Sequence, residues 1–316
     1  MSSSPGRIDV HFHIIPSFFT DVARAGGRLR GYPAWSPELS LEVMDRHRIE
    51  VAITSYVQPL VNLNPGGKLL ELTRRCNNYS AELCARWPKR FGAFGTVPLP
   101  DVNGSIAEID HVLDQFKFDG VCLYSNYEGK FLGDPAFDPV MELLNDRQAV
   151  VFVHPAIHPS VAQLGLPWPG FMIEFPFDTT RAAVNMLYNG TLERFPRIRI
   201  ILAHAGGVVP FLAWRLSVSP MIDPRLPQLS REQVHAGLRR YWYDNALSYG
   251  AESMGALTPI ADSAKILYGS DWPYANTKVL AEADKTLGAP DHLTGAQRVA
   301  INRGNAVALF PRFGTV

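Results

Sequence analysis

The sequence has few cysteines, and their spacing predicts neither a metal site nor a disulfide framework. Cys76, Cys84 and Cys122 are odd in number, and no two of them form a Cys-x-x-Cys motif. We therefore expect free thiols, as is usual in a reducing compartment. The first residues lack the charged and apolar stretches of a secretory signal, which favours a cytoplasmic location.

An excess of charge is also absent. The 30 basic and 30 acidic side chains give a formal net charge of zero, so electrostatics favour neither a nucleic acid nor an anionic membrane as a partner. No apolar run is expected to reach the roughly 20 residues of a membrane span. What the chain does have is 47% hydrophobic residues over 316 positions, enough for one large core.

Eight short apolar runs recur along the chain, and amphipathic segments typical of helices lie between them. The runs are Ile8–His13, Val51–Val57, Phe91–Val97, Gly120–Tyr124, Val150–His154, Ile198–His204, Tyr241–Asp244 and Ile266–Ser270. Eight strands that alternate with helices predict an α/β fold, a (β/α)8 TIM barrel with residues 1–316 as a single domain. The rival, a doubly wound open sheet, needs a glycine-rich phosphate-binding turn that the sequence does not contain.

Five residues capable of binding a metal end these strands. His11 and His13 are separated by one residue, so a strand directs both imidazoles to the same face. His154 ends the fifth run, His204 ends the sixth and Asp271 follows the eighth. Because the carboxyl ends of barrel strands meet at one face, we expect the five side chains to converge there around a divalent metal. Nitrogen and carboxylate donors suit Zn²⁺ best, with Mn²⁺ or Fe²⁺ as alternatives.

These segments resemble the amidohydrolase superfamily, and specifically its branch of non-oxidative decarboxylases. That branch includes the aminocarboxymuconate semialdehyde, γ-resorcylate and 6-methylsalicylate decarboxylases. The matching motifs span nearly the whole chain: Asp9-Val-His11-Phe-His13, Trp35-Ser-Pro-Glu-Leu, Phe177-Asp178-Thr179-Thr180, Leu192-Glu-Arg-Phe-Pro196, His204-Ala-Gly-Gly207 and Tyr268-Gly-Ser-Asp-Trp-Pro273.

The resemblance implies a role for each residue of the constellation. His11, His13, His154 and Asp271 would hold the metal, Asp271 would also protonate the substrate, and His204 would act as its partner or as a fifth ligand. The fourth run and the two residues after it contain no lysine or glutamate to bridge a second ion, so we predict one metal per chain. No acid closely follows His154, which counts against hydrolytic deamination.

The substrate is predicted from aromatic residues near the expected mouth of the barrel. Flat apolar walls for a small ring would come from Phe12, Trp35, Phe177 and Trp272, with Arg30 as a further substrate contact. The semialdehyde decarboxylases carry an arginine where this chain has Gly31, which favours a monocarboxylated phenol such as a salicylate. We therefore expect a metal-dependent decarboxylase of a salicylate-type acid, for example 6-methylsalicylate, in a homodimer like its relatives. The alternative is a mononuclear metal-dependent hydrolase of a lactone or an amide.

Three aspartates are further candidates beside this site. Asp9 would occupy a buried polar position or support a ligand from below. Asp178 would cap a helix or contact substrate, and Asp244 would support a ligand from the seventh strand. Four histidines in helical, charged surroundings are expected on the surface: His47, His111, His235 and His292.

Overall fold

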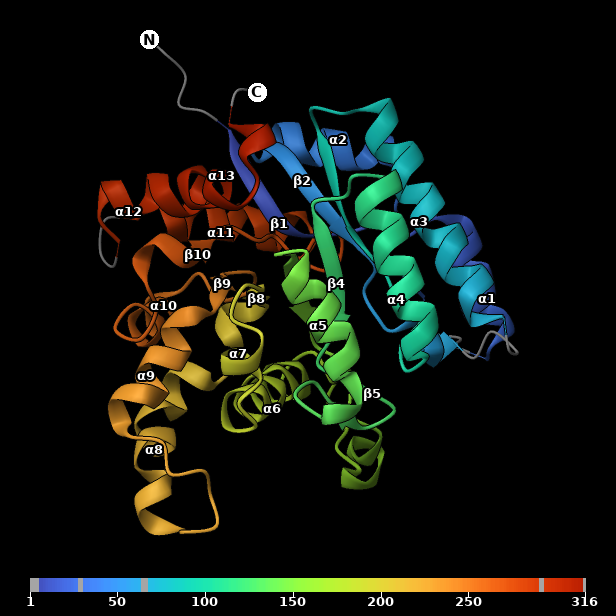
Figure 1. The fold of residues 1–316 in the computed structure, drawn as a ribbon. Coiled ribbons are helices and arrows are strands. Elements are labelled where there is room, and N and C mark those ends of the chain that lie inside the picture. Colours follow the sequence, from blue (N-terminus) through green and yellow to red (C-terminus); the bar gives the residue numbers. More distant parts are fainter. Residues whose placement is uncertain (1–5, 28–30, 64–67, 290–292, 315–316) are drawn as a thin grey trace.

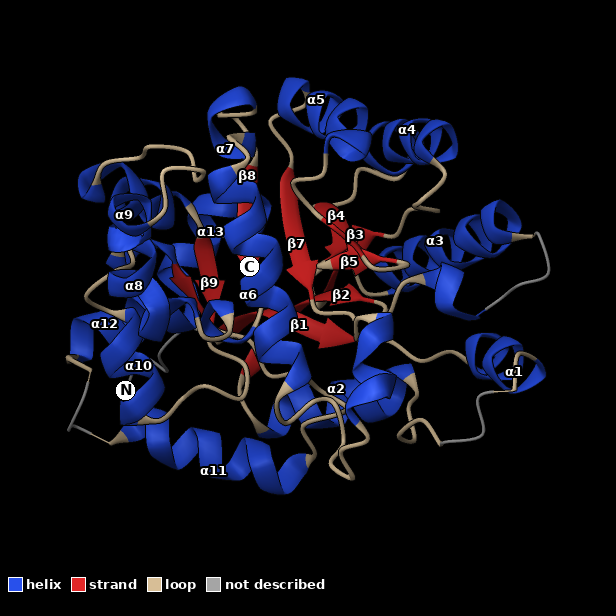
Figure 2. Ribbon diagram, turned by 90° about the horizontal axis from the view of Figure 1, so that it is seen from below, coloured by secondary structure: helices blue, strands red, loops and turns tan. Residues whose placement is uncertain are grey.

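The computed structural model describes residues 6–27, 31–63, 68–289 and 293–314. It shows eight parallel strands in a ring surrounded by helices (Figures 1 and 2). In their order around the ring the strands are β1 (Arg7–His13), β2 (Ile49–Ser55), β3 (Phe91–Gly95), β4 (Gly120–Tyr124), β7 (Val150–His154), β8 (Arg199–Leu202), β9 (Trp242–Asp244) and β10 (Ile266–Leu267). Backbone hydrogen bonds close the ring between its first and last strands. Val10 N donates to Tyr268 O at 3.0 Å, and Asp271 N donates to His11 O at 2.8 Å. The predicted TIM barrel is confirmed.

Helices follow the strands and cover the outside of the ring. They are α1 (Ser17–Ala25), α2 (Pro37–Arg46), α3 (Leu69–Arg86), α4 (Val102–Asp110), α5 (Asp138–Asp146), α6 (Glu174–Tyr188), α7 (Thr191–Arg194), α8 (Val209–Ile222), α9 (Arg231–Arg240), α10 (Ala251–Leu257), α11 (Thr277–Gly288), α12 (Gly295–Val299) and α13 (Asn305–Leu309). A short hairpin of β5 (Asn126–Tyr127) and β6 (Lys130–Phe131) lies outside the barrel sheet.

Local sequence explains where several helices begin. Ser36 accepts a hydrogen bond from Leu39 N, and Pro37 occupies the first turn of α2, where its missing N–H is not needed. Ser230 and Gln233 form a reciprocal capping box at the start of α9. Asp178 lies inside the first turns of α6 rather than at its N-cap position, which Ile173 occupies, so the predicted capping role is wrong.

The segment His204–Ile222 is the one part of the described chain that is long and apolar enough to cross a membrane, with a mean hydropathy of 1.2. It is not one straight helix. Its first residues form a tight turn with Ala205 at φ 56°, and α8 follows with 14 residues, about 21 Å at 1.5 Å per residue. That length is shorter than the roughly 30 Å hydrocarbon core of a bilayer.

The two ends of the barrel differ. Strands β1 and β2 begin at the upper end in Figure 1, near α13, whereas β5 and much of α8 lie at the lower end. The strands run parallel, so their carboxyl ends share this lower face, where functional side chains gather in barrels of this kind.

Candidate metal centre

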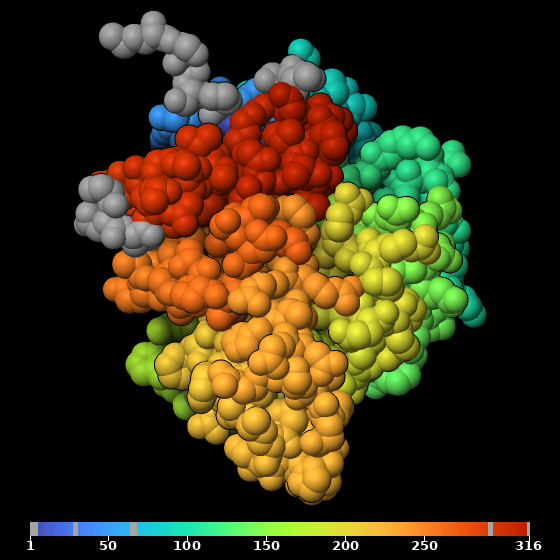
Figure 3. Space-filling model, turned by 60° about the vertical axis from the view of Figure 1, so that its left-hand side comes forward, coloured from blue at the N-terminus to red at the C-terminus, as the bar shows by residue number. Residues whose placement is uncertain are grey.

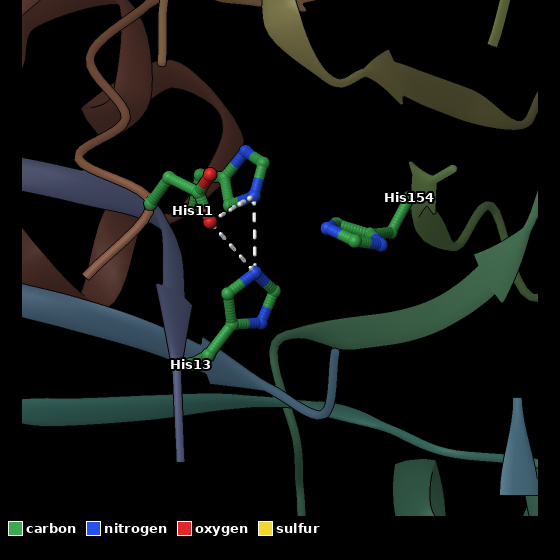
Figure 4. A group of neighbouring side chains, drawn as sticks. His11, His13 and His154 are labelled. Carbon is green, nitrogen blue, oxygen red and sulfur yellow. Dashed lines mark hydrogen bonds and ion pairs between the residues drawn. The ribbon is translucent and has the colours of Figure 1, made fainter. Parts of the chain in front are cut away.

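His11 and His13 form the first half of a buried cluster at the carboxyl end of β1. Both side chains are fully buried, and their Nε2 atoms lie 3.1 Å apart. Strand alternation places them on one face, as the sequence predicts. Figure 4 shows the two rings joined by a dashed line, with His154 reaching towards them from the other side.

His154 at the end of β7 and Asp271 after β10 complete the cluster. One ligand atom from each of His11, His13, His154 and Asp271 lies within 4.8 Å of all the others. Asp271 Oδ1 is 3.2 Å from His13 Nε2 and 3.5 Å from His11 Nε2. This is the only group of three or more potential ligands found in the described part of the chain.

Each of the three rings turns its Nδ1 atom towards a hydrogen-bond acceptor. His11 Nδ1 lies 2.9 Å from Asp244 Oδ2, and His154 Nδ1 lies 2.9 Å from the carbonyl oxygen of Pro155. His13 Nδ1 faces the carbonyl oxygen of Ser55 at 3.4 Å. A neutral imidazole carries one N–H, so protonation at Nδ1 leaves the Nε2 lone pair free for a metal.

The electrostatics of the cluster also fit a cation. Burial lowers the pKa of His13, and burial together with His13 and His11 holds the pKa of His154 well below its usual range, so both rings are neutral donors. Burial lowers the pKa of His11, but Asp244 and Asp271 outweigh it and raise this pKa to about 10. Burial raises the pKa of Asp271, but His11, His13 and His204 hold it well below the ordinary value. Three nitrogens and a carboxylate oxygen are a suitable ligand set for one divalent transition metal.

His204 lies beside the cluster on a strained turn. Its Nε2 is 3.5 Å from Asp271 Oδ2, whereas the oxygen paired with His13 Nε2 is Oδ1. His204 and Ala205 have φ of 54° and 56°, followed by Gly206 and Gly207, which also have positive φ. A Cβ on Gly207 would lie 2.0 Å from the carbonyl oxygen of Pro176, which explains the glycine there. Asp271 itself has φ 60°. Backbone held in this region is costly and is often found at functional sites.

Two buried aspartates near the cluster accept hydrogen bonds that connect separate segments of the chain. Asp9 Oδ1 accepts hydrogen bonds from His11 N and Ser270 N, both at 3.0 Å. Burial raises the pKa of Asp9 to about 7. Asp178 Oδ2 accepts hydrogen bonds from Asn126 Nδ2, at 2.7 Å, and from Ser125 Oγ. It therefore links α6 to the end of β4, and nothing in the described residues places it against the metal ligands.

Two aromatic rings flank the cluster at the mouth. The ring of Tyr274 stands at 78° to that of His13 with centroids 5.6 Å apart, and Phe175 meets His154 at 5.8 Å. The sequence predicts Phe177, and not Phe175, as an aromatic wall of the site. Phe177 is 41% exposed and lies 5.9 Å from the Arg181 guanidinium. Both phenylalanines lie in the first turns of α6, and only the way this helix packs decides which one meets the site.

The other residues expected to contact substrate have different positions. Phe12 is fully buried and pairs with the backbone of Trp272; as the residue between two inward-facing histidines, it faces the opposite side of β1, so it does not line the site. Trp272 is itself buried next to Asp271, whereas Trp35 packs against Tyr79 at 6.1 Å. Arg30 lies outside the described residues.

His47 corrects a further expectation. It was expected on the surface but is only 4% exposed, and its Nδ1 lies 2.7 Å from Asp284 Oδ2 at the outside of the barrel. Its partner Asp284 lies in α11, far along the chain, so the charged residues around His47 in the sequence do not indicate that it is buried.

Comparison with known proteins agrees with this geometry. The profile of the amidohydrolase family matches residues 8–312. The chain is 36% identical to decarboxylase yanB of Aspergillus niger, with 97% of this chain and 88% of that protein covered. It is 34% identical to the 6-methylsalicylic acid decarboxylase of Penicillium expansum, with 97% and 96% covered. The solved structure of a 5-carboxyvanillate decarboxylase mutant from Novosphingobium aromaticivorans, with bound manganese, shares the fold with a TM-score of 0.87 at 20% identity, covering 98% of both chains.

The family profile covers almost all of the barrel, and the curated relatives align over nearly their full length. The chain therefore belongs to the amidohydrolase family and is a carboxy-lyase of its non-oxidative decarboxylase branch.

Proposed function

We propose that this protein removes CO₂ from a small phenolic acid of the salicylate type, with 6-methylsalicylate as the first candidate. The observation that carries this proposal is the cluster of His11, His13, His154 and Asp271, with His204 on the second oxygen of Asp271. Two relatives that share a third of their residues with this chain are named for 6-methylsalicylic acid decarboxylation, which supports this choice of substrate class.

We propose one divalent ion per chain, with Zn²⁺ first and Mn²⁺ second. Three imidazole nitrogens and one carboxylate suit Zn²⁺, whereas solved structures of the same fold contain manganese. When bound, such an ion supplies positive charge that orients an anionic substrate and stabilises charge that develops on it.

The reaction itself needs one proton at the ring carbon that carries the carboxylate. As the carbon–carbon bond breaks, its electron pair returns to the ring, CO₂ leaves and aromaticity is restored. We propose that Asp271 delivers that proton. Because His11, His13 and His204 keep its pKa well below the usual value, Asp271 is a carboxylate before the reaction and must take up one proton from solvent in each turnover; its protonated form is then a strong acid that readily protonates a weakly basic carbon. His204 Nε2 positions the Oδ2 atom of this carboxyl group.

The flanking rings support an aromatic substrate. Tyr274 beside His13 and Phe175 beside His154 present aromatic surface on two sides of the cluster. A flat ring held between such surfaces keeps one orientation towards Asp271, and orientation of this kind lowers the barrier without new chemistry.

The direct test is turnover of 6-methylsalicylate by the zinc- or manganese-loaded protein. We expect stoichiometric release of CO₂ and 3-methylphenol, detected by gas analysis and chromatography. Salicylate lacking a methyl group and benzoate lacking the hydroxyl group serve as comparison substrates. If lactones or amides are hydrolysed and no phenolic acid releases CO₂, the proposal is wrong.

We also propose a homodimer in the cytoplasm. Four large apolar side chains are exposed on α8: Phe211, Trp214, Met221 and Ile222. In Figure 3 the orange segment that follows this helix projects from the lower end of the molecule. A second copy of the chain would cover such a surface, which monomeric soluble proteins rarely expose. The free cysteines Cys76, Cys84 and Cys122 are compatible with a reducing compartment.

A further inference from the structure

Asp244, the last residue of β9, makes contacts that the proposed reaction does not use. Its side chain is fully buried. Its Oδ2 lies 2.9 Å from His11 Nδ1, and its Oδ1 accepts hydrogen bonds from His204 N at 3.1 Å and from Ala246 N at 2.9 Å. One carboxylate therefore contacts a metal-ligand candidate and the backbone of the residue that positions Asp271.

The two oxygens of Asp244 have partners of different kinds. Both partners of Oδ1 are backbone N–H groups, which only donate, so this position must be occupied by an acceptor. Oδ2 faces a ring nitrogen that can carry a proton or a lone pair. Because a carboxylate accepts and does not donate, it favours the tautomer of His11 in which Nδ1 carries the proton.

From this geometry we propose that Asp244 is a positioning residue that sets the tautomer of the neutral His11 ring, with the proton on Nδ1 and the Nε2 lone pair directed to the metal. That Nε2 is the atom 3.1 Å from His13 Nε2 and 3.5 Å from Asp271 Oδ1. The inference rests on the metal centre proposed above. It adds a residue that holds a ligand in its binding form without touching the ion or the substrate.

His11 depends on a side chain more than the other two rings do. The Nδ1 atom of His154 faces the carbonyl oxygen of Pro155, and that of His13 faces the carbonyl and hydroxyl oxygens of Ser55. A main-chain carbonyl remains an acceptor whatever the side chain. Asp244 is therefore the position where one substitution of equal size can reverse the hydrogen bond to a ligand.

Asp244→Asn makes that reversal. The two backbone N–H groups force the amide oxygen into the Oδ1 position, so the amide NH₂ group faces His11 Nδ1. Two donors cannot pair, and the ring must move its proton to Nε2, where it blocks the lone pair. We expect metal affinity to fall about 10- to 100-fold, the usual consequence of losing such a support. The substitution keeps the shape of the side chain and both backbone hydrogen bonds.

Asp9→Asn is the matched control. Asp9 is also fully buried, and its Oδ1 also accepts two backbone hydrogen bonds, from His11 N and Ser270 N. Its Oδ2, however, has no hydrogen-bond partner in the described residues. The amide of Asp9→Asn therefore meets no histidine ring, and we expect its metal affinity to remain close to that of the wild-type protein.

Zinc affinity is measured by competition with a chromogenic chelator for the wild type and both variants. Weak binding by Asp244→Asn alone supports the inference. If Asp244→Asn binds zinc as tightly as the wild type, the inference is wrong and the proposed function still stands. The same holds if Asp9→Asn loses as much zinc affinity as Asp244→Asn, because general damage to buried carboxylates would then explain the effect. A wild-type protein that binds neither zinc nor manganese overturns the metal centre itself.

A second measurement uses the wild-type protein, so its main result does not depend on how Asp244→Asn folds. In the zinc-loaded wild-type protein, labelled with ¹⁵N at histidine and assigned with a His11→Gln variant, His11 should show a proton bonded to Nδ1. In folded Asp244→Asn this signal should disappear. An unprotonated Nδ1 in the wild type refutes the assignment of Asp244, even if the metal is bound.

Discussion

Removal of the metal should lower the thermal stability of the protein by an amount that depends on pH. The perturbation is dialysis against a chelator, followed by measurement of the melting temperature with and without added zinc. Because the ligands come from β1, from β7 and from the segment after β10, the ion binds only the folded barrel and stabilises it by mass action.

The size of the effect follows from chain length and ligand excess. At a free metal concentration 100 times the dissociation constant, binding contributes about 2.7 kcal/mol. The unfolding entropy of a 316-residue chain is about 0.66 kcal/mol per kelvin at about 2.1 cal/mol per kelvin per residue. The melting temperature should therefore rise by about 4 °C on zinc addition, and by about 6 °C at a 1,000-fold excess.

The pH dependence has a definite sign. In the metal-free protein the pKa of His11 is raised to about 10, so near neutral pH a proton must leave this ring before Nε2 can bind an ion. Metal affinity should thus increase about tenfold per pH unit below this pKa. At constant free zinc, raising the pH from 7 to 8 should enlarge the melting-temperature difference by about 2 °C.

Two histidine variants make the assay specific. His154→Gln removes a ligand and should abolish the zinc-induced shift. His47→Gln removes a buried histidine paired with Asp284 outside the cluster, so it should keep the shift whatever its own stability. A full shift in the His154 variant, or none in the wild type with zinc in excess, would refute the reasoning.

Four further results are expected. Asp271→Asn should reduce the rate of CO₂ release by at least 10²-fold because the proton donor is lost, and a near-normal rate in single-turnover assays would contradict this role. Phe175→Ala should raise KM for a phenolic acid more than Phe177→Ala does, since only the first ring meets His154; equal kinetics would contradict the arrangement of the mouth. The metal-free wild type should lose stability relative to Asp9→Asn as the pH rises from about 4 to about 7, because burial raises the pKa of Asp9 and so makes its deprotonation unfavourable in the folded protein. A difference in free energy of unfolding that stays constant over this pH range in urea denaturation would contradict this. Trp214→Glu should turn a dimer into a monomer in sedimentation measurements, and an unchanged dimer would exclude this face of α8.

The order of elements is already present in the sequence. Eight apolar runs are confirmed as barrel strands, and the bounds of Gly120–Tyr124 and Val150–His154 agree fully with β4 and β7. Strands buried on both faces need continuous apolar residues, so their signal is local and strong. The His-x-His pattern of β1 likewise places both imidazoles on one face through strand alternation alone.

Other features depend on contacts between distant segments. One such feature is that Phe175 rather than Phe177, two residues further along α6, meets the cluster. This outcome does not follow from local pattern, because what the helix packs against decides which of its side chains face the cluster.

The sequence by itself determined the barrel and the residue types at its mouth, because strand periodicity and strand ends are local properties. Only the tertiary structure decided which donors meet and what supports them. Asp244 and Asp271 are both aspartates next to a strand end, but one faces the back of a histidine ring and the other its front. That difference comes from the closure of the ring between β10 and β1, a contact between residues more than 250 positions apart.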